Sequence, residues 1–134
     1  MIALRVFFFV VLASMLAVTS WASWRCPLFA IPGDVAGHPW FIATLFDAYW
    51  GFLTFYVWVV FKQTAWAARA IWLVAILLLG NVAMSLYCLA ELWRAKPAEG
   101  LRGVLTSQRA DVGVLGPVLA AIGITVVALG WATS

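Results

Sequence analysis

Charged side chains are scarce in this sequence, where they make up 10% of the 134 residues. A soluble domain carries about 25%. Hydrophobic residues make up 66% of the chain and its mean hydropathy is +1.07, which is more apolar surface than a soluble core of this size can bury. The composition therefore excludes an ordinary soluble domain and predicts a single integral membrane domain over residues 1–134.

Residues that could carry site chemistry are also few. The two cysteines, Cys26 and Cys88, make neither a disulfide framework nor a metal site. The single histidine, His38, cannot supply both axial ligands of a bis-histidine haem. The sequence has no nucleophile elbow, no phosphate loop and no basic run. We therefore expect a protein that is not an enzyme, has no metal site and does not bind nucleic acid.

Four apolar runs are each long enough to cross ~30 Å of hydrocarbon, which takes about 20 helical residues. They predict an all-α membrane protein with four transmembrane helices, at about residues 4–24, 39–61, 70–93 and 112–131. The short link between the second and third runs predicts a tight antiparallel hairpin. The first run also resembles a signal peptide with a small-x-small cleavage site at Ser20-Trp21-Ala22. Its length and its terminal tryptophans favour a retained helix.

The polar loop at residues 94–111 separates the last two runs. Part of it could form an interfacial helix, with Leu101, Val104 and Leu105 facing lipid. Lys and Arg counts leave the orientation of four spans open. A cytoplasmic N-terminus would place three of these residues inside and five outside, which favours the reverse, whereas Arg5 at the start of the first helix favours a cytoplasmic N-terminus.

Asp47, inside the second apolar run, is the most informative single residue. A charged side chain in hydrocarbon costs roughly 2.5–3.5 kcal/mol on insertion scales, so it usually faces other helices or a polar cavity. Helical spacing and the hairpin register place further polar residues near its depth. The predicted polar intramembrane cluster is Ser14, Thr44, Asp47, Asn81 and Ser85. Such a cluster either pins helix packing or forms a proton or ligand site.

Aromatic residues gather near the start of the same run. His38, Trp40, Tyr49 and Trp50 are candidate contacts for a cofactor, because histidine can ligate a chlorophyll-type magnesium and aromatic rings stack on conjugated ones. The candidate ligands are a bound lipid, a carotenoid, a quinone or a chlorophyll-type pigment. The alternative is a solvated loop histidine beside aromatic rings that face lipid or neighbouring helices.

The last apolar run is uncharged and rich in small residues. Gly116 and Ala120, like Gly113 and Pro117, stand four positions apart, a spacing that lets helix backbones approach closely. The predicted packing positions are Gly113, Gly116, Ala120 and Gly123. They would pack within the chain or against a partner.

A motif links the second run to the segment that follows it. It reads Pro39-Trp40, Ala43-Thr44-Leu45-x-Asp47-x-Tyr49 and Val57-Trp58-Val59-x-x-Lys62. This pattern resembles a family of small multi-pass membrane proteins of plants and bacteria, classed as a domain of unknown function. The resemblance covers about residues 5–93 and implies no activity. It marks Pro39, Trp40, Tyr49, Trp58 and Lys62 as positions of interest, while Gln63 departs from the acidic residue of the family pattern.

These features favour a non-catalytic accessory or assembly subunit of a larger photosynthetic or respiratory membrane complex. It would lie in the bacterial inner membrane with the lipid bilayer and other membrane subunits as partners. The alternative is a small proton-linked transporter or permease that uses Asp47 and Asn81. A lipid-modifying enzyme with Asp47 and His38 as acid and base is disfavoured, because nine helical residues separate the pair by about 13 Å.

Overall fold

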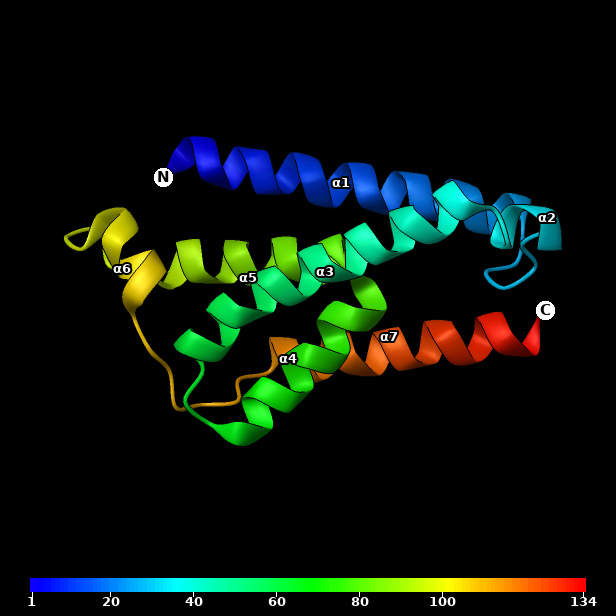
Figure 1. Cartoon of the computed structure of the whole chain (residues 1–134). Coiled ribbons are helices and arrows are strands. Elements are labelled where there is room, and N and C mark those ends of the chain that lie inside the picture. The colour runs from blue at the N-terminus through cyan, green and yellow to red at the C-terminus, as the bar shows by residue number, and fades with distance from the viewer.

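The computed structural model describes residues 1–134 and is helical from end to end. Its only β-type contact is an isolated bridge between Gln63 and Arg109. The helices are α1 (Ile2–Arg25), α2 (Gly33–Ala36), α3 (Pro39–Lys62), α4 (Trp66–Leu79), α5 (Asn81–Arg94), α6 (Gly100–Thr106) and α7 (Leu115–Ala132). The all-α prediction is confirmed, and Figure 1 shows α1 lying along α5 and α7 packing against α4.

Three helices, α1, α3 and α7, are long and apolar enough to cross a membrane, where the sequence predicted four. The first two contain 24 residues each and the third contains 18, or about 36 Å and 27 Å at 1.5 Å per residue. The start of α3 is set by local chemistry. Pro39 occupies its first turn, and the His38 Nδ1 accepts a hydrogen bond of 3.3 Å from the backbone N–H of Trp40.

The predicted third span is wrong because the chain reverses at Gly80. This residue ends α4 and begins α5 with φ 50° and ψ −124°, a backbone conformation that L side chains rarely adopt. A Cβ atom there would lie 2.6 Å from the Cζ atom of Phe52 on α3. Each of the two helices has 14 residues, or about 21 Å, too short to cross ~30 Å of hydrocarbon alone. The reversal is visible where α4 meets α5 in Figure 1.

The core lies where α3, α4, α5 and α7 meet, and Tyr87 of α5 is at its centre. The Tyr87 ring makes edge-to-face contacts with Trp72 at 4.7 Å, Trp58 at 5.4 Å and Phe55 at 6.0 Å between ring centroids. Such pairs stabilise by about 0.5–1.5 kcal/mol beyond their buried area. In contrast, α1 lies along α5 and buries none of its residues completely.

Small residues let α7 pack closely on α4. A Cβ atom at Gly123 would lie 2.8 Å from the Cβ of Leu78, and one at Gly116 would lie 3.1 Å from Trp72. Ala120 is also buried, so this face is used within the chain. Gly113 lies before the helix, with φ 66°, because α7 begins at Leu115 and not at residue 112.

The reversal at Gly80 determines which segments share an end of the molecule. At one end, the Arg5 Nη2 donates to the Leu92 carbonyl at 2.9 Å, which places the start of α1 beside the end of α5. At the other end, Phe29 and Trp131 pack edge to face at 6.2 Å between ring centroids. Figure 1 accordingly shows the N- and C-termini at opposite ends.

Candidate functional site

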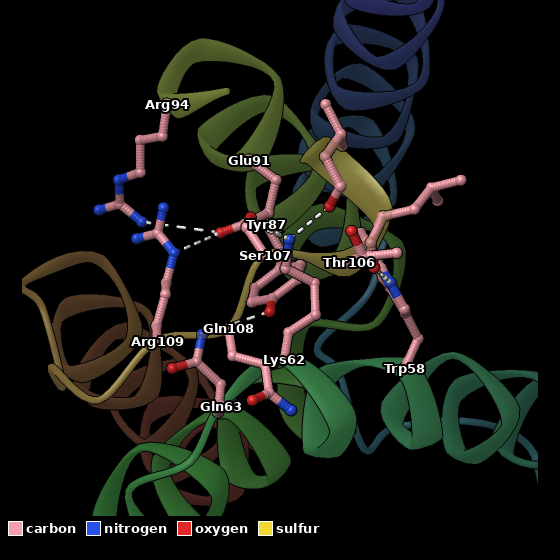
Figure 2. A network of polar contacts seen from close by, with 12 residues as sticks. Trp58, Lys62, Gln63, Tyr87, Glu91, Arg94, Thr106, Ser107, Gln108 and Arg109 are labelled. Carbon is pink, nitrogen blue, oxygen red and sulfur yellow. Dashed lines mark hydrogen bonds and ion pairs between the residues drawn. The ribbon is translucent and has the colours of Figure 1, made fainter. Parts of the chain in front are cut away.

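A buried ion pair joins the last residue of α3 to α5. The Lys62 Nζ lies 2.5 Å from the Glu91 Oε2, and the two side chains are 0% and 2% exposed. Helix α3 ends at Lys62 because the following Gln63 adopts an extended conformation. The ammonium therefore points from the end of one helix towards the last turn of another, as Figure 2 shows.

The Lys62 ammonium has further partners in the segment around α6. It donates to the carbonyl oxygen of Val104 and, at 3.2 Å, to the hydroxyl of Ser107. Together with Glu91 these contacts give the ammonium one oxygen acceptor for each of its three protons. The same nitrogen lies 5.5 Å from the centroid of the Trp58 ring, within the range of a cation–π contact.

Glu91 also faces two arginines. The Arg109 Nε lies 3.0 Å from the Glu91 Oε1 and the Arg94 Nη1 lies 3.9 Å from it. Both contacts have the geometry of ion pairs rather than of aligned hydrogen bonds, since this oxygen accepts none. Glu91 thus lies between the buried Lys62 and the partly buried Arg109, and its negative charge offsets the repulsion between the two cations.

Hydrogen bonds between uncharged groups hold the chain in place around the ions. The Arg109 backbone N–H donates to the Lys62 carbonyl, and the Arg109 carbonyl accepts from the N–H of Thr64, both at 2.7 Å. The Gln63 Nε2 donates to the Tyr87 hydroxyl at 3.2 Å. An adjoining cavity that includes Gln63 and Arg109 in its wall has a volume of about 10 Å³, which is room for one water molecule. The cluster of Lys62, Glu91 and Arg109 is called the buried charge network below.

The polar contacts of the network are all made within the chain. The network connects α3, α5 and the segment after α6, and the Lys62 ammonium has no free proton left to offer a substrate. The neighbouring cavity is smaller than any organic substrate. No group of three or more metal-ligating side chains lies close enough together to hold an ion.

The predicted polar intramembrane cluster does not assemble through hydrogen bonds. The Ser14 and Thr44 hydroxyls each donate to a carbonyl of their own helix, at 2.9 Å and 2.8 Å. Ser85 is buried in α5 and Asn81 is half-buried beside Gly80. Asp47 is exposed on α3 and has no ion-pair partner within the chain.

The other predicted contact residues lie on or before the exposed half of α3. His38 caps the helix, and Trp40, Tyr49 and Trp50 are exposed. An open, wholly apolar depression of about 360 Å³ runs along the helix surface there. Its lining residues are Leu45, Phe46, Tyr49, Trp50 and Leu53. We call this surface, with Asp47 beside it, the α3 face.

Sequence reasoning missed most of the buried charge network. The family pattern marked Lys62 and Trp58, but Glu91 has the sequence position of a solvated residue near a helix end, and Arg109 that of an ordinary loop cation. The signal that could have found them is Gly80-Asn81 inside the third apolar run, because glycine followed by a polar residue is a helix-stop pattern. A stop there returns Glu91 to the end of the molecule that holds Lys62.

Comparison with known proteins identifies a family and no activity. No curated protein and no solved structure matches the chain. The family model described as a protein of unknown function (DUF1475) matches residues 1–112. This match extends beyond the predicted resemblance at about residues 5–93 and includes the polar loop at residues 94–111. Since the match covers most of its length, the chain belongs to this family of proteins of unknown function.

Proposed function

We propose that the protein is a non-catalytic membrane subunit that binds another membrane protein through the α3 face. The observation that carries this proposal is the position of Asp47, which is exposed in the middle of an apolar helix with no partner in the chain. A carboxylate against hydrocarbon costs roughly 2.5–3.5 kcal/mol on insertion scales. Polar groups of a neighbouring protein would remove that cost.

The surroundings of Asp47 have the composition of a protein interface. Phe46 and Trp50 are 65% and 64% exposed and flank an open depression. Exposed large aromatic side chains next to a polar group are typical of the residues that dominate binding energies. The buried residues of α3, Val59 and Lys62, lie towards its other end, so the face around Asp47 is free to meet a partner.

The buried charge network supports the non-catalytic part of the proposal. Its ions are paired with each other, and the cavity beside Gln63 and Arg109 has room for one water molecule. A transporter that uses Asp47 would need a polar pathway beside it, whereas the depression there is lined by five apolar and aromatic residues. We therefore prefer the subunit to the transporter.

The proposal is tested by extracting the tagged full chain from its native membranes in a mild detergent and separating assemblies by size. We expect the wild-type chain to migrate with other membrane proteins, which mass spectrometry and an absorbance scan of the fraction would identify. Asp47→Asn and Trp50→Ala should release the chain from that assembly. Trp66→Ala is the matched control, because Trp66 is 80% exposed but lies on α4, away from the α3 face.

Two results would overturn the proposal. One is migration of the wild-type chain alone at its own mass of 14.7 kDa plus detergent. The other is an assembly that survives both α3-face substitutions unchanged. Flux of protons or solute through the purified chain in vesicles, lost in Asp47→Asn, would favour the transporter instead.

A further inference from the structure

The cations of this chain gather at one end of the fold. Contacts place Arg5 beside the end of α5, and Lys62 beside Glu91 and Arg109. The Arg69 Nε donates to the Gln63 carbonyl at 2.6 Å, which puts the start of α4 at the same end. Arg94 ends α5, Lys96 lies in the link that follows it, and Arg102 is on α6. This end therefore holds seven of the eight Lys and Arg residues of the chain, namely Arg5, Lys62, Arg69, Arg94, Lys96, Arg102 and Arg109.

The opposite end has no excess of cations. It carries Arg25 as its single cation, with Asp34 nearby and Asp47 further along α3. The first end has seven cations and three carboxylates, Glu91, Glu99 and Asp111, and so a net charge of +4. The rest of the chain has one cation and two carboxylates, a net charge of −1, which together give the +3 of the whole chain. The fold therefore separates charge along its long axis.

We propose that the end with seven cations lies on the cytoplasmic side of the membrane and binds the headgroups of anionic lipids. Cytoplasmic segments near membrane spans are enriched in Lys and Arg, and a ratio of seven to one is a strong bias. In this arrangement α1, α3 and α7 cross the membrane, while α4 and α5 enter from the cytoplasmic side and return. The irregular backbone at Gly80 then lies against Phe52 within the protein, where a membrane tolerates it.

Helix α6 gives this end an amphipathic surface. Leu101 and Leu105 stand four positions apart on one face, each 49% exposed, and Arg102 is exposed beside them. Val104, predicted to face lipid, is instead buried, and it anchors the helix through its carbonyl to Lys62. An anchored helix with two exposed leucines and neighbouring cations fits the boundary between acyl chains and anionic headgroups.

A second hydrogen bond holds α6 in place. The Trp58 Nε1 donates to the Leu105 carbonyl at 3.0 Å. The link between α5 and α6 adds the exposed Lys96 to the surface. We call the surface formed by Lys96, Leu101, Arg102 and Leu105 the lipid-binding end. The inference uses the distribution of charge and does not depend on the proposed partner of the α3 face.

Thiol labelling on intact cells tests the sidedness. Cys26 is a native exposed thiol at one end and Cys88 is buried. Two variants with a single cysteine each are compared. The first is Cys88→Ser, which keeps Cys26. The second carries Ala98→Cys together with Cys26→Ser and Cys88→Ser, because Ala98 is exposed near α6. A membrane-impermeant maleimide should label Cys26 in intact cells and the residue at position 98 only after permeabilisation. Labelling of both on the same side would indicate four spans, and reversed labelling would place the cations outside; either result overturns the proposal.

Lipid affinity tests the second half of the proposal. The full chain is reconstituted with spin-labelled phosphatidylglycerol or phosphatidylcholine, and the relative association constants are measured. Lys96→Gln and Arg102→Gln should each lower the preference for phosphatidylglycerol about fivefold. Arg25→Gln is the matched control and should leave the preference unchanged. An equal loss in the control, or no loss in a variant with both lipid-binding-end substitutions, would overturn the inference.

Discussion

Helix α3 carries two charged residues whose surroundings differ completely. Lys62 is fully buried, with oxygen partners from α5 and from the segment around α6. Asp47 lies fifteen positions before Lys62 on the same helix, is exposed, and has no ion-pair partner in the chain. The comparison teaches that the role of a charged residue in an apolar helix depends on which segments of the chain pack against it. The chain itself surrounds Lys62, and Asp47 is left to the molecules around the chain.

The buried pair of Lys62 and Glu91 contributes more to fixing how α3 packs on α5 than to the net stability of the fold. Removing two ions from water costs several kcal/mol each, and their attraction offsets this only when the geometry is good and other hydrogen bonds are made. Here Lys62 and Glu91 meet at 2.5 Å and the ammonium has two more acceptors. The network therefore fixes the register of α3 against α5, and its loss should cost more than its presence contributes.

Removal of the central carboxylate should have the largest effect. Glu91→Gln leaves the buried Lys62 and the partly buried Arg109 without a counter-ion, and we expect a loss of about 3–5 kcal/mol in the free energy of unfolding. The measurement is denaturant-induced labelling of the buried thiol of Cys88 in a Cys26→Ser background. Glu99→Gln, at an exposed carboxylate, is the control. Equal stability of the two variants would contradict a structural network.

A substitution at the reversal should have the next largest effect, because it displaces α5 and with it Glu91. Gly80→Ala combines a positive φ with a contact of 2.6 Å to the Phe52 ring, and should cost about 2–4 kcal/mol. Gly51→Ala, a helical glycine with no neighbour within 4 Å, should be neutral or slightly stabilising. The same thiol-labelling assay compares them. A stable Gly80→Ala protein would mean that the third apolar run is able to continue as one helix.

Packing of α7 on α4 should be less sensitive, because it lies outside the charge network. Gly123→Ala places a methyl group 2.8 Å from the Cβ of Leu78 and should cost about 1–3 kcal/mol by forcing the helices apart. Ile124→Ala, on the exposed side of α7, is the comparison. Unfolding curves in detergent should show a larger loss of stability for Gly123→Ala than for Ile124→Ala. The opposite order would mean that another face of α7 packs on α4.

The smallest expected effect is at the edge of the network. Trp58→Phe keeps an aromatic ring near Lys62 but removes the 3.0 Å hydrogen bond from the indole N–H to the Leu105 carbonyl. We expect a loss of about 0.5–1.5 kcal/mol in the free energy of unfolding. Phospholipid selectivity should change little, since the cations of the lipid-binding end stay in place. A loss as large as that of Glu91→Gln would give Trp58 a role beyond this bond.

Much of the fold could be predicted from apolar run lengths. The runs at about residues 4–24, 39–61 and 112–131 correspond to α1, α3 and α7 within a few residues. The run at 70–93 was wrongly predicted to be one span, because the mean hydropathy of a long window does not detect a single Gly80. This residue has a positive φ and lies close to Phe52. That one residue also reverses the charge count, from three against five for four spans to seven against one for three.

The site was less predictable because its residues come from distant positions. Lys62, Glu91 and Arg109 are brought together by the reversal at Gly80 and by a backbone bridge between Gln63 and Arg109. Gly80-Asn81 is the only local signal of the reversal, and no local pattern encodes the backbone bridge. The depth register that predicted an Asp47 cluster assumed a straight third span, and the structure gives Asp47 no hydrogen-bonded link to Ser14, Asn81 or Ser85.

The most direct test of this account compares the two charges of α3 in one experiment. Lys62→Gln and Asp47→Asn each replace an ion by a neutral amide, and their unfolding is followed in the same detergent by Cys88 labelling. The account predicts a large loss of stability for Lys62→Gln, because Glu91 loses its closest counter-ion, and a change within about 0.5 kcal/mol for Asp47→Asn. Equal losses would contradict it, since Asp47 would then be as much a part of the folded core as Lys62.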